Sequence, residues 1–161
     1  SQDTSGNVAR LDSIELVPHL YEWRFDLDTG TTKERQLDDL ATEFPRINDT
    51  IQGKKARFSY NPRIAKDAAL KFDGLVKYDL LTGAKTVWAP PPHWFVGEPS
   101  FAPAPAATSE DHGWLVTFGT SRTEDVSVCF VLDARDMTEV ARVSLPHRIP
   151  LGFHSYFCPD A

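Results

Sequence analysis

Cysteine is scarce in this chain. Its 161 residues include two, Cys129 and Cys158, and neither belongs to a CxxC pair. Two cysteines cannot build a disulfide framework, and their spacing does not match the common zinc sites. The sequence also lacks any run of about 18 apolar residues and a basic-then-apolar start, so neither a membrane-spanning helix nor a signal peptide is expected. We therefore predict a reduced, cytoplasmic setting.

Positive charge is also in short supply. The chain has 17 Lys and Arg against 23 Asp and Glu, which gives a formal net charge of −6. Nucleic-acid binding depends on a basic surface that contacts phosphates, so this composition argues against a nucleic-acid partner. With 41% hydrophobic and 25% charged residues, the chain has the composition of one ordinary globular domain.

Helical spacing of apolar residues is nearly missing, and only residues 63–72 are expected to form a turn or two of helix. Instead, a β-rich pattern repeats three times: a short run, an aspartate, a turn and a second short run. The aspartates Asp26, Asp79 and Asp133 recur at nearly equal intervals of roughly 50 residues. Gly30 and Gly83 supply the positive φ that a tight turn needs, whereas residues 134–136 of the third repeat are a weaker turn signal. The pattern predicts three β-hairpins.

Further strand candidates lie between the hairpins, at residues 56–60, 99–103 and 113–121, with a polar turn at 109–113. Several short strands in a unit of about 40–50 residues, repeated along the chain, are typical of a β-propeller. We therefore predict an all-β fold, a partial β-propeller of about three blades. The alternative is an all-β sandwich whose hairpins look alike by chance.

Three chemically useful side chains follow the hairpins in phase with the repeat. Glu43, Glu98 and His154 each stand a similar distance after one of the three aspartates, and the steps between them nearly equal the hairpin period. In a propeller, the connection after an outer hairpin leads to the innermost strand of the next blade, so these side chains should converge near one end of the axis. At metal sites an imidazole commonly binds through one nitrogen and donates its other N–H to a carboxylate. The simpler alternatives are a buried histidine that satisfies a carbonyl, and glutamates that are surface charges at strand edges.

Six motifs resemble the carotenoid cleavage oxygenase family, which includes the apocarotenoid and lignostilbene dioxygenases. They occur in family order from about Leu20 onward: "EFPRIN" (43–48), "LVKYDLLTG" (75–83), "GEPSFAP" (97–103), "SEDHGWLV" (109–116), "VLDARDM" (131–137) and "LPHRIPLGFH" (145–154). The resemblance implies a seven-bladed β-propeller with a non-haem Fe(II) held by four histidines, which three glutamates support.

Residue by residue, the resemblance implies that His154, in "GFH", is the last of the four iron ligands. It further implies that Glu98 hydrogen-bonds to His154, and that Glu43 orients a histidine outside this chain. Ser155 stands where the family usually has glycine. This departure bears on how closely the backbone packs and leaves the ligand in place.

Family members are much longer, and their other three iron ligands lie upstream of the part that this chain resembles. We therefore interpret residues 1–161 as the C-terminal segment of a single β-propeller domain. None of the other histidines matches a family ligand, and loop or surface positions are expected for all of them: His19, His93, His112 and His147. The chain alone is not expected to assemble the four-histidine iron site or to be active.

The activity that the resemblance implies is cleavage of a C=C bond with Fe(2+) and O2, which gives two carbonyl products. The substrate would be elongated and apolar: a carotenoid, an apocarotenoid or a stilbene. Two alternatives stay open, a non-catalytic propeller fragment that acts as an interaction module and a glycoside hydrolase with Glu43 and Glu98 as its acid/base pair. Four aromatic residues are candidates for lining a substrate tunnel, although ordinary core packing is favoured for each: Trp94, Phe95, Phe153 and Phe157.

Two further predictions concern surfaces. The apolar run "VWAPPPHWFV" (87–96) is interpreted as a packed connection between blades, and the alternative is a substrate entry or a peripheral membrane contact. A partial propeller leaves unpaired edge strands at both ends, which favours pairing with another chain. We therefore expect two kinds of partner, the other blades of the full-length chain and further copies of the fragment.

Overall fold

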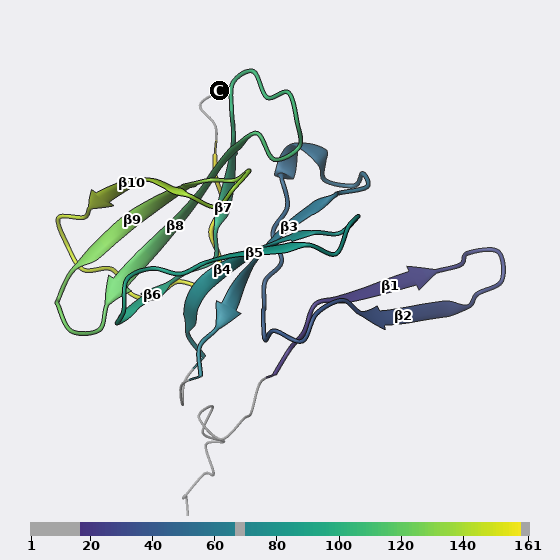
Figure 1. The fold of residues 1–161 in the computed structure, drawn as a ribbon, viewed down its shortest axis with the longest axis horizontal. Helices are drawn as coiled ribbons and strands as arrows, with labels where there is room; N and C mark the ends of the chain where they lie inside the picture. Colours follow the sequence, from purple (N-terminus) through teal and green to yellow (C-terminus); the bar gives the residue numbers. More distant parts are fainter. Residues whose placement is uncertain (1–16, 67–69, 159–161) are drawn as a thin grey trace, which may run out of the picture.

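The computed structural model describes residues 17–66 and 70–158, and the regular secondary structure of these residues is almost entirely β-strand (Figure 1). The strands are β1 (Tyr21–Phe25), β2 (Thr32–Gln36), β3 (Phe58–Ile64), β4 (Phe72–Asp79), β5 (Lys85–Trp88), β6 (Trp94–Val96), β7 (Ser100–Pro103), β8 (Gly113–Ser121), β9 (Ser127–Asp133) and β10 (Glu139–Ser144). One 3-10 turn, η2 (Asp49–Ile51), interrupts them within the described ranges. The predicted all-β fold is confirmed.

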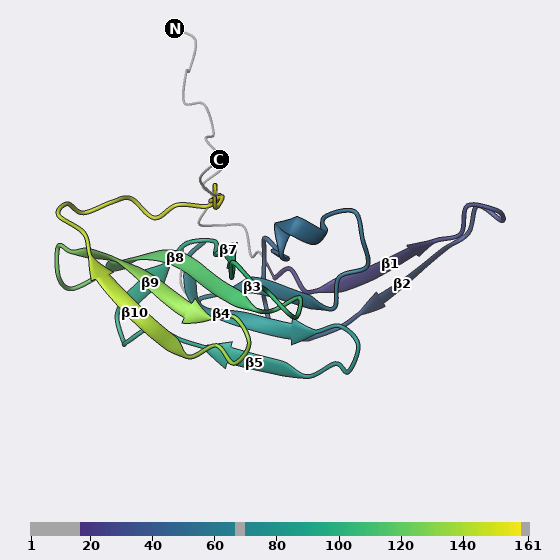
Figure 2. The ribbon, with the colours of Figure 1, turned by 90° about the horizontal axis from the view of Figure 1, so that it is seen from above.

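The strands group into two antiparallel units and one separate hairpin. In the first unit β4 lies between β3 and β5, and in the second unit the order is β7–β8–β9–β10. Strand β6 pairs with the end of β4 and with β8, so it joins the two units into one sheet of eight strands. The β1–β2 hairpin forms its own sheet and projects to one side in both views (Figures 1 and 2). Two blade-like units and one outer hairpin make a partial β-propeller.

All three predicted hairpins are present, and they share one turn geometry. In each, the amide of the fourth residue after the aspartate donates to the aspartate carbonyl: Gly30 to Asp26 at 2.9 Å, Gly83 to Asp79 at 2.8 Å, and Met137 to Asp133 at 2.8 Å. The donor residues have φ of 67°, 76° and 66°. The third hairpin therefore adopts the same left-handed conformation without glycine. Met137 is 3% exposed and belongs to the core, so its side-chain burial offsets the backbone strain.

The expected helical turn at residues 63–72 is wrong for the part of it that the structure describes. Its first two residues belong to β3 and Phe72 begins β4, while residues 67–69 lie outside the described ranges. The amide of Ala65 donates to the carbonyl of Lys71 at 2.8 Å, which continues the β3–β4 pairing beyond the strands. Phe72 is 2% exposed in the core, and the apolar burial of a strand residue outweighs a weak helical pattern here.

The core lies between the two units. Tyr60, Phe72 and Leu75 from β3 and β4 pack with residues of β8 and β9, among them Leu115 and Phe130. Burying these side chains against each other removes large apolar areas from water, which is the main force that joins the units.

Polar contacts add directional links between the units. The ammonium group of Lys77, a residue only 6% exposed, donates to Asp111 at 2.7 Å and to the Arg135 carbonyl at 2.8 Å. The hydroxyl of Tyr60 donates to the carbonyl of Ala134 at 3.2 Å. The hydroxyl of Tyr60 is buried, and this burial raises its pKa, so it stays protonated as a donor.

The apolar run 87–96 forms the end of β5, a proline-rich connection and β6. The ring of Trp88 lies 5.2 Å from Phe130 in an edge-on contact, and Trp94 lies 5.7 Å from the same ring. The favoured interpretation of this run as a packed connection is therefore confirmed for its two tryptophans. Among the residues placed by the structure, no helix has the length and apolar character needed to cross a bilayer.

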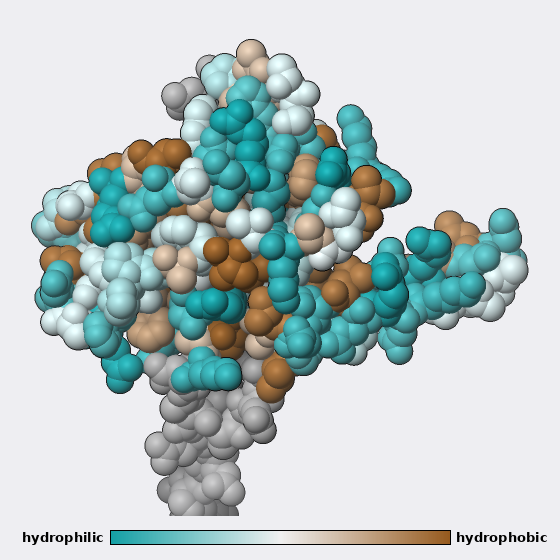
Figure 3. Space-filling view, in the orientation of Figure 1, coloured by the Kyte–Doolittle hydropathy of each residue, from teal (hydrophilic) through white to brown (hydrophobic). Residues whose placement is uncertain are grey.

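The second unit is apolar on both faces of its sheet. Opposite the core face, Val116 pairs with Val131, and Phe118 pairs with Cys129, which in turn pairs with Val143. Phe118 is 44% exposed and Val143 is 53% exposed. Further apolar side chains are exposed over the strand units and along the β1–β2 hairpin (Figure 3). Antiparallel sheets with one solvated face usually carry polar residues there, so this outer face of β8–β10 is an unusually apolar exposed surface.

Candidate functional site

The three side chains that recur in phase lie at comparable places in the fold. Glu98 lies two residues before β7, the first strand of the second unit. Glu43 lies in residues 42–46, which run beside β3 through the bridges Thr42–Arg63 and Arg46–Tyr60. His154 lies in the C-terminal segment after β10, which crosses above the sheet (Figure 2). The connection after each hairpin thus leads to the first strand position of the next unit, as predicted for Glu43 and Glu98.

The expected hydrogen bond between Glu98 and His154 is present. Nδ1 of His154 lies 3.1 Å from Oε2 of Glu98. The Glu98 side chain is 4% exposed, whereas the imidazole is 75% exposed. The two simpler interpretations are therefore wrong: the histidine is not buried against a carbonyl, and the glutamate is not a surface charge. In the tautomer that donates Nδ1–H to the carboxylate, Nε2 keeps its lone pair.

Two other groups contact the Glu98 carboxylate. The amide of Ser155 donates to Oε2 at 3.2 Å, and Nε of Arg46 lies 3.5 Å from Oε1 as an ion pair. Arg46 also reaches Asp49, with Nη2 donating to Oδ2 at 3.1 Å. Among the residues that the structure describes, its buried Nε has no hydrogen-bond partner, so the contact with Glu98 is an ion pair without a hydrogen bond. The guanidinium of Arg46 therefore places a positive charge beside the buried carboxylate that contacts the imidazole.

Glu43 approaches the same place through its neighbour rather than through its own carboxylate. Oε2 of Glu43 accepts a hydrogen bond from the amide of Phe44 at 2.8 Å, and Phe44 has a φ of 47°. This left-handed conformation is strained for a bulky residue. It brings the Phe44 ring edge-on to the imidazole of His154, with centroids 4.8 Å apart. The orientation of a histidine outside this chain by Glu43 stays a prediction.

Phe44 also belongs to a small aromatic cluster under the imidazole. Its ring lies 5.9 Å from Phe72 and 6.0 Å from Phe153, both in edge-on contacts. Phe153 is nevertheless 45% exposed, so ordinary core packing is wrong for this candidate tunnel residue. Of the other three candidates, Trp94 packs on Phe130 as favoured, and Phe95 and Phe157 are half-buried.

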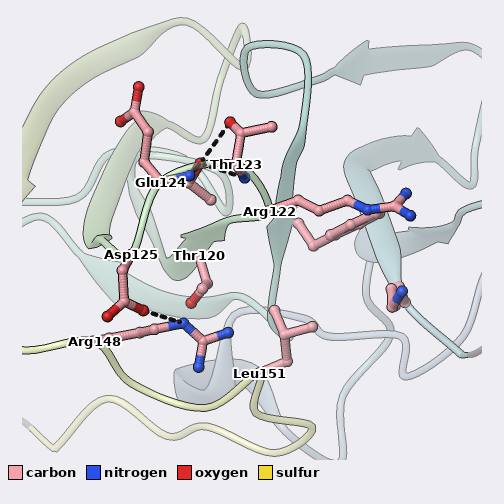
Figure 4. Close-up of a pocket in the computed structure, with 10 residues that line it drawn as sticks. Thr120, Arg122, Thr123, Glu124, Asp125, Arg148 and Leu151 are labelled. Carbon is pink, nitrogen blue, oxygen red and sulfur yellow. Dashed lines mark hydrogen bonds and ion pairs between the residues drawn. The ribbon is translucent and has the colours of Figure 1, made fainter.

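A separate open hollow of about 400 Å³ lies near the turn between β8 and β9 (Figure 4). Its lining includes Arg122, Glu124 and Arg148, but neither Glu98 nor His154. Arg148 pairs with Asp125 at 3.2 Å across its rim. Charged, solvated side chains of both signs do not suit an elongated apolar ligand, so this hollow is not the candidate site.

The donor set available for a metal is small. The other four histidines all lie outside strands: His19, His93, His112 and His147. Within residues 17–66 and 70–158, no group of three or more His, Cys, Asp or Glu side chains is arranged to hold a metal ion. His154 fits as a single ligand, because its Nδ1 is engaged by a buried carboxylate while the rest of the ring is exposed.

Sequence reasoning identified Glu98 and His154 but missed Arg46, Phe44 and the bonds of Ser155. Arg46 and Phe44 both lie within the "EFPRIN" motif, so the resemblance pointed to the segment without assigning them a task. A basic residue three positions after the in-phase glutamate was the available signal for an ion pair. It could not reveal that the partner would be the glutamate of the next unit.

Comparison with known proteins gives one consistent family. The family model for the retinal pigment epithelial membrane protein matches residues 2–159. A carotenoid cleavage oxygenase of Mycobacterium tuberculosis is 39% identical over an alignment of 148 residues, and the match covers 88% of this chain and 29% of that protein. The carotenoid 9,10(9',10')-cleavage dioxygenase 1 of Arabidopsis thaliana is 34% identical, over 88% of this chain and 28% of that protein.

Solved structures agree with these relatives. A mutant of the apocarotenoid oxygenase of Synechocystis superposes with a TM-score of 0.78 and 28% identity, over 88% of this chain and 31% of that one. A cobalt-substituted form of the Synechocystis enzyme superposes with a TM-score of 0.76 and 27% identity, over 87% of this chain and 31% of that one. This chain therefore spans about 30% of the length of the proteins it matches.

Proposed function

This chain belongs to the carotenoid cleavage oxygenase family, the family of the retinal pigment epithelial membrane protein, and we propose that it is the C-terminal segment of the single β-propeller domain of an iron-dependent dioxygenase. The full-length enzyme would cleave a C=C bond of a carotenoid, apocarotenoid or stilbene with O2 into two carbonyl products. The observation that carries this proposal is the exposed His154 imidazole held by the buried Glu98 carboxylate, at a strand start of a propeller unit.

Each residue of the site has a definite task in this proposal. His154 would supply one of the four imidazole ligands through Nε2. Glu98 accepts a hydrogen bond from Nδ1–H and thereby sets the tautomer that leaves Nε2 free. Arg46 balances the charge of Glu98, and Phe44 limits rotation of the ring by its edge-on contact. A ferrous ion bound there would supply the capacity to bind and activate O2.

The names of the relatives support the reaction class. One is a carotenoid cleavage oxygenase, another is a cleavage dioxygenase, and a solved relative accepts cobalt in place of its metal. The aromatic cluster of Phe44, Phe72 and Phe153 beside His154 would offer apolar surface to an elongated substrate. In the same proposal the isolated chain is inactive, since the described residues present one ligand of the set.

Metal analysis of the full-length protein tests the assignment. We expect one iron per molecule, and loss of that iron together with cleavage activity in His154→Ala. His147→Ala is the matched control, because His147 is exposed after β10 and lies outside the site. Full retention of iron by His154→Ala would refute the role of His154. A wild-type protein that binds no iron would refute the function itself.

A second candidate function is a non-catalytic interaction module, which the exposed apolar outer face of β8–β10 favours. The iron measurement separates it from the enzyme, because an interaction module needs no metal. The glycoside hydrolase alternative finds no favourable observation. Glu98 is already engaged by His154, Ser155 and Arg46, and its 4% exposure leaves little access for a sugar oxygen. Activity of Glu98→Gln on an aryl glycoside, compared with wild type, is the direct check.

A peripheral membrane contact is also part of the proposal for the full-length protein. The connection 87–96 is half-buried at its tryptophans, at Phe95 and at two of its three prolines, so it offers less apolar surface than the sequence suggested. Cosedimentation with lipid vesicles, with and without substitutions in this connection, would test whether it contacts a bilayer.

A further inference from the structure

The C-terminal segment that carries His154 has no strand of its own, and its backbone and hydroxyl hydrogen bonds to the sheet fall at two places. The first point is a cluster of hydroxyl groups at the end of β8. The amide of Ile149 donates to Oγ of Ser127 at 3.0 Å, and Oγ1 of Thr120 donates to the Ile149 carbonyl at 3.1 Å. After this point, residues 150–154 are all exposed. His154 is therefore the last residue of an exposed stretch. Its ring contacts Glu98 and Phe44, and the second hydrogen-bonded attachment of the backbone follows directly after it.

That second point is Ser155. Its hydroxyl donates to the carbonyl of Glu98 at 2.8 Å, and it lies 2.8 Å from the hydroxyl of Ser100. Because a hydroxyl carries one hydrogen, Ser100 must be the donor in the second bond. Ser100 and Glu98 are each 5% exposed, so these hydrogen bonds connect an exposed segment to buried groups. A buried carbonyl or hydroxyl left without a partner would cost free energy, so the attachment is favoured.

The amide of Ser155 completes the arrangement. It donates to Oε2 of Glu98 at 3.2 Å, which is the same oxygen that accepts from Nδ1 of His154 at 3.1 Å. The backbone after the imidazole and the imidazole itself therefore share one acceptor. If the segment shifts, both bonds change together, and the direction of Nε2 changes with them.

We propose that Ser155 is a positioning residue for His154, whose hydroxyl locks the C-terminal segment onto Glu98 and Ser100 so that the imidazole presents Nε2 in one direction. The hydroxyl is the part that matters, because alanine or glycine would keep the amide bond to Glu98 and lose both bonds of Oγ. The hydrogen bonds of the Ser155 hydroxyl are a property of this chain. Their effect on iron binding rests on the proposed function.

The test compares three serine-to-alanine variants of the full-length protein. Ser155→Ala removes both hydroxyl bonds, and Ser100→Ala removes one of them but leaves Ser155 bonded to Glu98. Ser144→Ala is the control, since Ser144 is exposed on β10. Partners that orient a metal-bound histidine typically change metal affinity 10- to 100-fold, so we expect iron to be lost to a chelator roughly tenfold faster in Ser155→Ala. Ser100→Ala should show a smaller increase, and Ser144→Ala none.

A second measurement needs no metal. In metal-free protein with 15N-labelled histidine, NMR reports which ring nitrogen of His154 carries the proton. We expect one tautomer, with Nδ1 protonated, in wild type and Ser144→Ala, and a mixture of tautomers in Ser155→Ala. An unchanged tautomer in Ser155→Ala would overturn the lock, and so would an effect of Ser100→Ala larger than that of Ser155→Ala. If wild-type protein bound no iron, the proposed function would fail while the NMR comparison would still decide the role of Ser155. If Ser155→Ala did not fold, the comparison of Ser100→Ala with wild type would decide it.

Discussion

The ion pair between Arg46 and Glu98 should contribute strongly to stability because one partner is buried. Nε and Oε1 lie 3.5 Å apart, with side-chain exposures of 24% and 4%. Two unit charges 4 Å apart attract by about 1 kcal/mol in bulk water and by about 4 kcal/mol near a protein surface. The partial exposure of Arg46 places this pair between those limits. We therefore expect a coupling free energy of about 2–3 kcal/mol.

A double-mutant cycle measures that coupling. Urea unfolding would be followed for wild type, Arg46→Gln, Glu98→Gln and the double variant, at concentrations where sedimentation shows one species. Arg46→Gln should be the most damaging change, because it leaves the buried carboxylate without its cation. In the double variant the second substitution should recover much of the loss, since neither charge is then left alone.

An exposed pair in the same chain provides the control. Arg142 and Glu139 on β10 are closer, at 2.9 Å, but their side chains are 40% and 26% exposed. Solvent screening should reduce the coupling of this pair to about 0–1 kcal/mol. If the Arg46–Glu98 coupling were no larger than that of the control, burial would not govern this interaction, and the argument for Arg46 as the charge partner of Glu98 would be refuted.

Three further variants test the second and third turns and the outer face of β8–β10. Met137→Gly should relieve about 1 kcal/mol of left-handed strain but lose about 2–3 kcal/mol of apolar burial, so thermal unfolding should show a net loss. Gly83→Ala has open space for its methyl group at a φ of 76°, so it should cost only the strain, about 1 kcal/mol; equal stability of the two variants and wild type would contradict this account. Phe118→Ser should shift the isolated chain from oligomers towards monomers in sedimentation velocity, and a wild-type chain that is already monomeric would contradict the expected self-association.

The repeat was readable from the sequence because its turns have a chemical signature. Asp26 and Asp79 are each followed four residues later by glycine, and that glycine adopts the positive φ that closes the hairpin. The third turn was harder to predict because Met137 adopts the same conformation for a different reason, namely its burial in the core. Tertiary packing supplies that reason, and no local pattern contains it.

The candidate site was also predictable from the repeat, but its tertiary contacts were not. The nearly constant period of the repeat fixes which unit a side chain belongs to, and it therefore brought Glu98 and His154 together. The period does not tell which groups a side chain contacts. The long side chain of Arg46 extends to Glu98 of the next unit, and the hydroxyl of Ser155 donates to the carbonyl of Glu98. Neither contact can be read from the sequence.

Two features of the molecule point to the same conclusion about how the site is completed. The imidazole of His154 is 75% exposed although a buried carboxylate holds it in place, which is an unusual arrangement for a surface histidine. The outer face of β8–β10 is apolar although nothing in the described chain covers it. In the full-length protein, a neighbouring blade would cover the apolar face, and further metal ligands would surround Nε2 of His154. If so, substitutions that weaken the blade contact, such as Phe118→Ser, should also speed the loss of iron from the full-length protein, even though Phe118 is no part of the hydrogen-bond network around His154.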